Sequence, residues 1–296
     1  MSMGKAFLCL GVGLFAMVGA IWAAPLKAPS LTKVWELDLP VAETVVYDVK
    51  SKVIYATGMG ASPNTGVTWK IALDGTVLAK DWATGLNQVR GSKVVGKFLF
   101  IAELQSLAKV DLATGKVVKR YEAPEAGMFN NIARDEVGNL YITDTPKNAI
   151  YKYSVDKDVF EKWLESPDLE WPNGILYENG RLILAPWGTV TDPATWATDV
   201  PGRMQTLTIP TKEISFLGGN EEPLANGDGL VGDGKGNYFV GDWMNGNIYL
   251  VNRDSEWVFV ATTNQGMGDF TFILGEELLL VPVGKLNKLY AFKVER

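Results

Sequence analysis

Short runs of apolar residues recur along the chain at a nearly constant spacing. Six runs have the length and composition of buried strands, and their first residues lie 40 to 45 residues apart, except for one gap of 56. Glycine or asparagine precedes most of them, as in tight hairpin turns. The six runs are 53–56, 98–101, 140–143, 182–185, 238–241 and 278–281.

Each run is followed by a segment of alternating apolar and polar residues, and five of the six by a third strand-like segment. With the strand expected before each run, a unit has four strands, which is the repeat of a propeller blade. No amphipathic helical pattern separates the units, which argues against an α/β barrel. The prediction is an all-β fold, a six-bladed β-propeller of four-stranded blades over residues 31–296. The alternative, a β-sandwich of short strands, is disfavoured by the even spacing.

The sixth unit reaches the end of the chain without an outermost strand. An unassigned strand-like segment, residues 33–37, stands near the other end. Pairing this segment with the last blade would close the ring and remove two exposed sheet edges. The sequence therefore predicts that the N-terminal strand completes the sixth blade.

The chain begins with a single lysine near its start and an apolar run over residues 6–24. This pattern is typical of a secretory signal peptide, which we place at residues 1–23 and which implies a periplasmic or secreted protein. An uncleaved membrane anchor is the alternative, because the run is nearly long enough to span a bilayer. No later segment is long and apolar enough to span, so no membrane span is expected in the mature chain.

Composition removes whole classes of chemistry. The chain has no histidine and a single cysteine, Cys9, which lies in the predicted leader. Histidine-dependent catalysis, histidine-liganded metals, disulfides and thiolate nucleophiles are therefore excluded from the mature chain. The 28 Lys and Arg against 34 Asp and Glu give a net charge of −6, which argues against nucleic acid as a partner. The remaining chemistry favours hard cations with oxygen ligands.

A second regularity concerns side-chain oxygens. Nine to eleven residues before each apolar run, where the innermost strand of each blade is expected to begin, stands an Asp, Asn or Glu. These residues are Glu43, Asn87, Asn130, Asn173, Asp228 and Asp269. Innermost strands line the channel of a propeller, so the six would converge on one mouth, where three carboxylates need a cation to offset their repulsion. Calcium suits this mixed set better than magnesium; alternatively, these residues merely satisfy backbone groups in turns.

The second strands should end at the same mouth. The residues that follow them include Glu103, Asp144, Trp187 and Asp242. The gap of 56 residues reflects an extra segment over residues 187–204, which is either a lid over the mouth or a simple insertion. Trp187 and Trp196 would supply an apolar wall for a ligand, or would only cap the edge of a blade.

Several of these stretches resemble the regucalcin and gluconolactonase family of six-bladed propellers. They are residues 41–47 (VAETVVY), 128–131 (MFNN), 171–174 (WPNG) and 226–229 (NGDG). The resemblance implies a divalent cation, usually calcium, bound by Glu43, Asn173 and Asp228, with Asn130 near both cation and substrate. Met128 stands where the sugar-lactone enzymes of this family tend to have an arginine, and Asn131 replaces an acidic residue. A more apolar, less charged pocket is therefore expected, which disfavours gluconolactone.

These observations predict a calcium-dependent hydrolase of lactones or other esters of small molecules. The cation would polarise the substrate carbonyl, and Asp228, or less favourably Asp269, would act as general base. Asn130, and less favourably Asn87, would orient the substrate, and Asp269 and Trp187 would also contact it. The rival is a non-catalytic binding propeller with a structural calcium, since one fold hosts both uses. Condensation chemistry of the strictosidine-synthase type is a third possibility that nothing in the sequence specifically supports.

Overall fold

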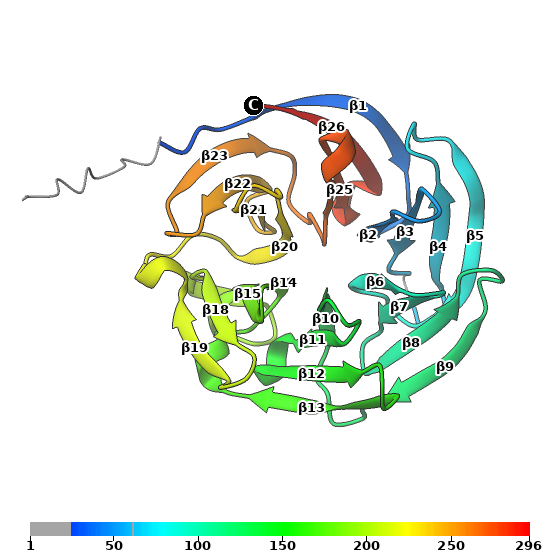
Figure 1. Cartoon of the computed structure of the whole chain (residues 1–296), viewed down its shortest axis with the longest axis horizontal. Helices are drawn as coiled ribbons and strands as arrows, with labels where there is room; N and C mark the ends of the chain where they lie inside the picture. Colours follow the sequence, from blue (N-terminus) through cyan, green and yellow to red (C-terminus); the bar gives the residue numbers. More distant parts are fainter. Residues whose placement is uncertain (1–24, 61) are drawn as a thin grey trace, which may run out of the picture.

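The structure is a computed structural model that describes residues 25–60 and 62–296. It is an all-β ring of six small antiparallel sheets, so the predicted six-bladed propeller is confirmed and the β-sandwich is wrong (Figure 1). Among the described residues, no helix is long and apolar enough to cross a membrane. The predicted signal peptide, residues 1–23, lies outside the described residues.

Each blade has four strands, numbered below from the channel outward. Blade one has β2 (Ala42–Asp48), β3 (Val53–Gly58), β4 (Gly66–Ile71) and β5 (Val77–Leu86). Blade two has β6 (Ser92–Val95), β7 (Phe98–Ala102), β8 (Ser106–Asp111) and β9 (Val117–Glu122). Blade three has β10 (Phe129–Arg134), β11 (Leu140–Asp144), β12 (Ala149–Ser154) and β13 (Val159–Glu165). Blade four has β14 (Gly174–Glu178), β15 (Arg181–Ala185), β18 (Gln205–Thr208) and β19 (Glu213–Phe216). Blade five has β20 (Gly227–Gly232), β21 (Asn237–Asp242), β22 (Asn247–Asn252) and β23 (Trp257–Thr262). Blade six has β24 (Thr271–Ile273), β25 (Leu278–Val283), β26 (Lys288–Glu295) and β1 (Ser30–Asp38). The described part of the chain also has five short 3-10 turns: η1 (Thr145–Lys147), η2 (Pro167–Leu169), η3 (Leu217–Gly219), η4 (Leu274–Glu276) and η5 (Gly284–Leu286).

The apolar runs of the sequence are the second strands of the blades. They are almost wholly buried, because each blade packs against a neighbour on both of its faces. The outermost strands, such as β13, instead alternate between exposed and half-buried residues. Aromatic rings fill the space between blades two and three: Phe100 of blade two lies 4.9 Å from Tyr153 of blade three. Within blade three, Phe129 packs edge-to-face on Tyr151 with centroids 4.7 Å apart.

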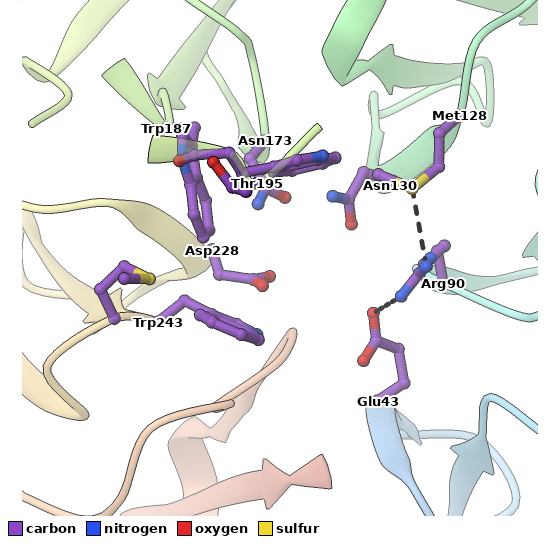
Figure 2. A pocket seen from close by; sticks show the side chains of 11 residues that line it. Glu43, Arg90, Met128, Asn130, Asn173, Trp187, Thr195, Asp228 and Trp243 are labelled. Carbon is purple, nitrogen blue, oxygen red and sulfur yellow. Dashed lines mark hydrogen bonds and ion pairs between the residues drawn. The ribbon is translucent and has the colours of Figure 1, made fainter. Parts of the chain in front are cut away.

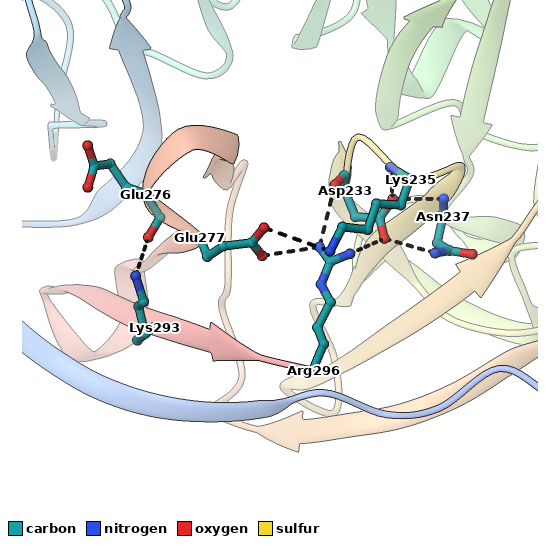
Figure 3. A network of polar contacts seen from close by, with 7 residues as sticks. All are labelled: Asp233, Lys235, Asn237, Glu276, Glu277, Lys293 and Arg296. Carbon is teal, nitrogen blue, oxygen red and sulfur yellow. Dashed lines mark hydrogen bonds and ion pairs between the residues drawn. The ribbon is translucent and has the colours of Figure 1, made fainter.

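The ring closes as predicted from the sequence. Strand β1 pairs antiparallel with β26, from Ser30 opposite Glu295 to Asp38 opposite Lys288. The last residue, Arg296, then reaches from blade six to blade five, where its guanidinium contacts Asp233 (3.1 Å), and it also contacts Glu277 (3.5 Å) (Figure 3). Contacts made by both ends of the described chain therefore close the ring of blades.

The extra segment of blade four forms a hairpin of its own. Strands β16 (Gly188–Asp192) and β17 (Ala197–Pro201) pair as a separate two-stranded sheet between β15 and β18. The hairpin leaves the blade at the mouth of the channel, and its tip brings Thr195 and Trp196 to a pocket at that mouth. The prediction that this segment emerges at the polar mouth is confirmed.

Candidate functional site

A pocket of about 230 Å³ opens at one mouth of the central channel (Figure 2). Its wall comes from residues at the starts of innermost strands, at the ends of second strands and at the tip of the extra hairpin. The lining residues are Glu43, Arg90, Met128, Asn130, Asn173, Trp187, Thr195, Trp196, Asp228, Trp243 and Met244. Five blades therefore contribute to one small cavity.

Three of the polar lining residues lie in irregularities of the innermost strands. The pairing register breaks around Glu43 in β2, around Asn130 in β10 and around Asp228 in β20. A β-bulge turns a side chain away from the regular alternation of a strand, which here aims it at the channel axis. Asn173 immediately precedes β14, where the next residue, Gly174, leaves no room for a side chain: a Cβ there would lie 2.3 Å from the Asp228 backbone oxygen. Backbone geometry thus places the predicted residues of four blades in one pocket.

Arg90 is a lining residue that the sequence-based prediction missed. Its Nη1 donates to Glu43 Oε1 at 3.0 Å, and its Nη2 lies 3.5 Å from Met128 Sδ (Figure 2). Its buried Nε has no hydrogen-bond partner among the described residues, so the guanidinium has an unused N–H donor. The neighbouring blade thus supplies an arginine against Met128, so the pocket does hold a positive charge beside that methionine.

Asn87 and Asp269 do not line the pocket. Asn87 lies between β5 and β6, and its backbone N–H donates to Glu103 Oε1 at 2.8 Å. Asp269 is buried beside the pocket, where its carboxylate accepts from Thr44 Oγ1 (3.3 Å) and contacts Lys93 Nζ (3.5 Å). Convergence therefore holds for four of the six residues, and the substrate contacts expected of Asn87 and Asp269 find no support in this geometry.

The acidic residues at the ends of the second strands hold loops instead of facing the pocket. They are Glu103, Asp144 and Asp242. Asp144 accepts the backbone N–H of Met128 at 3.0 Å, and Asp242 accepts that of Met244 at 3.1 Å. Glu103 binds Arg120 Nε at 2.8 Å. Two of these carboxylates thus position the loops that carry pocket methionines.

The three buried acids of the mouth are costly to ionise. Burial raises the pKa of Asp228 well above its usual range, and repulsion from Glu43 and Asp269 raises it further. Burial also raises the pKa of Glu43, against the lowering effect of Arg90. For Asp269, burial raises the pKa while Lys93 opposes it. Within the described chain, Asp228 is the acid without a cation of its own, since Arg90 pairs with Glu43 and Lys93 with Asp269.

The donor set is of the kind that calcium accepts. Glu43 and Asp228 offer carboxylate oxygens, and the buried Asn173 Oδ1 has no hydrogen-bond partner in the described structure. Within residues 25–60 and 62–296, no three Asp, Glu, Cys or His side chains are grouped as a metal site. The set instead combines two carboxylates with one amide, and its unpartnered oxygen next to an uncompensated carboxylate fits a bound cation.

Tryptophans form the apolar part of the wall. Trp187 is 4% exposed, and its ring contacts Trp196 edge-to-face at 5.2 Å and Trp243 at 5.6 Å between centroids. Trp196 also packs edge-to-face on Trp171 at 5.4 Å. The Trp187 indole N–H donates to the backbone oxygen of Trp196 at 3.0 Å. Both Trp187 and Trp196 therefore line the pocket, as the apolar-wall interpretation predicts, and they belong to a chain of four indoles.

Comparisons with known proteins place the chain by its fold. No family model matches the sequence, and no curated protein matches it. Among solved structures it is similar to a gluconolactonase from Xanthomonas campestris, with 14% identity, a TM-score of 0.69, and coverage of 93% of this chain and 99% of that chain.

Two further similar structures are lyases. One is a streptogramin B lyase, with 12% identity, a TM-score of 0.63, and coverage of 90% of this chain and 98% of that chain. The other is a virginiamycin B lyase from Staphylococcus aureus, made catalytically inactive by a histidine-to-alanine substitution and solved with quinupristin, with 11% identity, a TM-score of 0.59, and coverage of 90% of this chain and 98% of that chain. At these identities the likeness shows a shared propeller fold.

Proposed function

We propose that this protein is a calcium-dependent hydrolase of lactones or other carboxylic esters, acting at the pocket of Figure 2. The observation that carries the proposal is Asp228, a carboxylate that is 5% exposed and lies beside the unpartnered Asn173 Oδ1 and the acidic Glu43 without a cation of its own in the described chain. A purely structural role leaves this arrangement unexplained, because a buried charge without compensation destabilises the fold.

Glu43, Asn173 and Asp228 would hold the cation. When bound, calcium supplies Lewis-acid polarisation of an ester carbonyl and stabilises the negative charge that develops on its oxygen. Glu43 would bind it with the carboxylate that Arg90 also contacts, so the cation and the guanidinium would share this acid. Export through the predicted leader would bring the protein to a compartment where calcium is readily available.

Asp228 would serve as the general base toward water. A raised pKa brings a carboxylate toward the neutral range, where a base both accepts a proton readily and is partly ionised. A positive charge beside it would favour the ionised form that can take the proton. Its burial and its place on the pocket wall support this role.

Arg90 and Asn130 would position the ester. The guanidinium has donors that the described protein leaves weakly used, with Met128 Sδ as one acceptor and none for Nε. Asn130 is 7% exposed and donates a long hydrogen bond, 3.4 Å, to Thr145 Oγ1. Donors held in place before the reaction stabilise a developing oxyanion without further reorganisation.

The absence of histidine favours ester hydrolysis over the chemistry of the similar lyases. The virginiamycin B lyase is inactive once a histidine is replaced by alanine, and this chain has no histidine to take that role. The similar gluconolactonase has the highest TM-score of the three structures compared. Its activity on a lactone supports the proposed reaction class.

Turnover of a substrate panel tests the proposal. Purified protein is assayed with aliphatic, aromatic and sugar lactones and with aryl esters, after chelation and again after calcium is restored. We expect turnover that chelation abolishes and calcium restores, and a loss of about 100-fold or more in a folded Asp228→Asn variant. Activity that survives chelation would contradict the proposal. Calcium that raises Tm without turnover of any substrate would favour the binding propeller instead.

A further inference from the structure

The pocket wall places indole rings around the proposed catalytic acid. Trp187 and Trp243 flank Asp228, and Glu43, Arg90 and Asn130 lie across the cavity (Figure 2). The polar residues could serve one ester group, but the rest of a substrate would face indoles. The chemistry of that remainder can therefore be inferred from the aromatic part of the wall.

The polar atom of the most buried indole is already used within the protein. The Trp187 N–H is bonded to the Trp196 backbone oxygen, so this ring presents carbon surface to a ligand. Trp243 has one face occupied by Lys285, whose Nζ lies 4.6 Å from the ring centroid. Centroid separations of 5.2–5.6 Å along the chain of indoles are the spacing at which a further aromatic ring packs favourably.

The β16–β17 hairpin holds Trp196 in a fixed place. The residue adopts a left-handed backbone, with φ of 60°, and its N–H donates to the Asp192 oxygen at 2.8 Å. A bulky residue in this region is uncommon and is kept only when its surroundings determine it. Asn226 Nδ2 ties the hairpin to blade five through the Trp187 oxygen (2.7 Å) and Thr198 Oγ1 (2.9 Å). These contacts favour a rigid wall over a mobile lid.

The wall fits a sugar poorly. Glu43, Arg90 and Asn130 can bond a hydroxyl, but they lie across the cavity from the tryptophans. The cavity of about 230 Å³ admits only a small ligand, so one side of that ligand must face the indoles. The hydroxyls of a sugar lactone placed against indoles would lose their hydrogen bonds to water without replacement. A flat apolar ring would lose nothing polar and would gain contacts with the tryptophans.

We infer that the pocket selects small lactones or esters that carry an aromatic ring, with Trp196 as the principal residue that determines this specificity. The inference rests on the proposed function for the ester but on the tryptophan wall for the ring. The extra hairpin belongs to none of the four-stranded blades, and what its tip adds to the pocket is Thr195 and Trp196.

Binding of unreactive analogues tests the inference apart from catalysis. Isothermal titration compares dihydroquinolinone, the lactam counterpart of the aryl lactone dihydrocoumarin, with valerolactam, which lacks the aromatic ring. We expect the wild type to bind the aryl lactam about tenfold or more tightly, and Trp196→Ala to remove most of that ratio. Trp257→Ala, a change to a tryptophan that is 47% exposed on the outer strand β23, should leave the ratio unchanged.

A second variant guards against disruption of the hairpin by the first. Trp243→Leu changes a ring carried by blade five and should also lower the ratio.

Equal affinity for the two lactams, no binding of either, or an equal loss in Trp257→Ala would overturn the inference. A preserved ratio with no turnover of any ester would leave the aromatic selectivity standing and remove the hydrolase. Equal kcat/KM for dihydrocoumarin and valerolactone, together with equal affinities for the two lactams, would remove the aromatic selectivity and leave the hydrolase standing.

Discussion

Asp228 in the pocket and Asp233, which follows the opposite end of the same strand, are both buried acids, and their surroundings differ sharply. Asp233 is fully buried and accepts from the backbone of Lys235 and Asn237 at 2.7 and 2.9 Å, from Asn237 Nδ2 at 2.8 Å and from Arg296 at 3.1 Å (Figure 3). Asp228 has Asn173 as its neighbouring donor and like charges around it.

This difference separates an acid that holds the fold from one that is available for chemistry. Burial is nearly equal, so burial does not distinguish the two. The number of hydrogen-bond donors around each carboxylate distinguishes them. A carboxylate whose oxygens are all hydrogen-bonded has no free lone pairs for a ligand, whereas one with few donors is stabilised by a bound cation. Variants of the two acids should therefore respond differently to calcium, to denaturant and to pH.

The largest expected effect is on stability, at Asp233. Asp233→Ala would remove the buried carboxylate that accepts from Arg296 and Asn237, leaving Arg296 with its longer contact to Glu277. It should lower the free energy of unfolding by about 3 kcal/mol, measured by urea denaturation. The matched control is Asp135→Ala: Asp135 bonds Asn139 in the equivalent turn of blade three, and no arginine of the described chain pairs with its carboxylate. It should cost less, and an equal loss at both sites would show that Arg296 adds nothing.

Calcium should produce the next largest effect. A ligand present at 100 times its Kd raises the free energy of unfolding by about 2.7 kcal/mol, so calcium should raise the Tm of the wild type clearly. Asp228→Asn should show little of this gain, because one of the proposed ligands loses its charge. A calcium-dependent rise of equal size in wild type and variant would place the ion elsewhere.

Asp228→Asn should have the opposite sign from Asp233→Ala when no divalent ion is present. Removing an uncompensated buried charge should raise the free energy of unfolding at neutral pH by about 1–2 kcal/mol. Thermal and urea denaturation of chelated protein measure this change. Destabilisation comparable to that of Asp233→Ala would remove the distinction between the two acids.

The smallest expected effect is a pH dependence. The pKa of Asp228 is raised in the folded state, so the folded protein holds a proton that the unfolded chain releases at about pH 4. The stability of chelated wild type relative to Asp228→Asn should therefore fall as pH rises from about 4 through the raised pKa of the folded state. A relative stability that stays flat or rises across this range would show that the acid is already compensated.

Much of the architecture was predictable because blades repeat. The spacing of apolar runs located the second strands, and the unassigned segment at 33–37 identified β1 as the closing strand. Glu43, Asn130, Asn173 and Asp228 were predictable because each stands at the start of an innermost strand, where the fold turns side chains toward the channel.

Candidate residues were found by counting 9 to 11 residues back from each apolar run. Arg90 was missed because this count ignored differences in the length of the turn that joins the first and second strands of each blade. Blades two and four both turn in two residues, with Val95 opposite Phe98 and Glu178 opposite Arg181. This register makes Arg90 the counterpart of Asn173, and a crowded glycine follows each of them. The ion pair to Glu43 was beyond sequence reasoning, since it joins residues from two blades.

Calcium titration of the chelated protein, followed by turnover of dihydrocoumarin and by Tm on the same samples, decides whether one calcium ion both stabilises the protein and supports its catalysis. We expect rate and Tm to rise together with one half-saturation point in the wild type, and neither to rise in Asp228→Asn. A full rate before any calcium is added, or a rate that stays at zero while Tm rises, would contradict a calcium-dependent hydrolase.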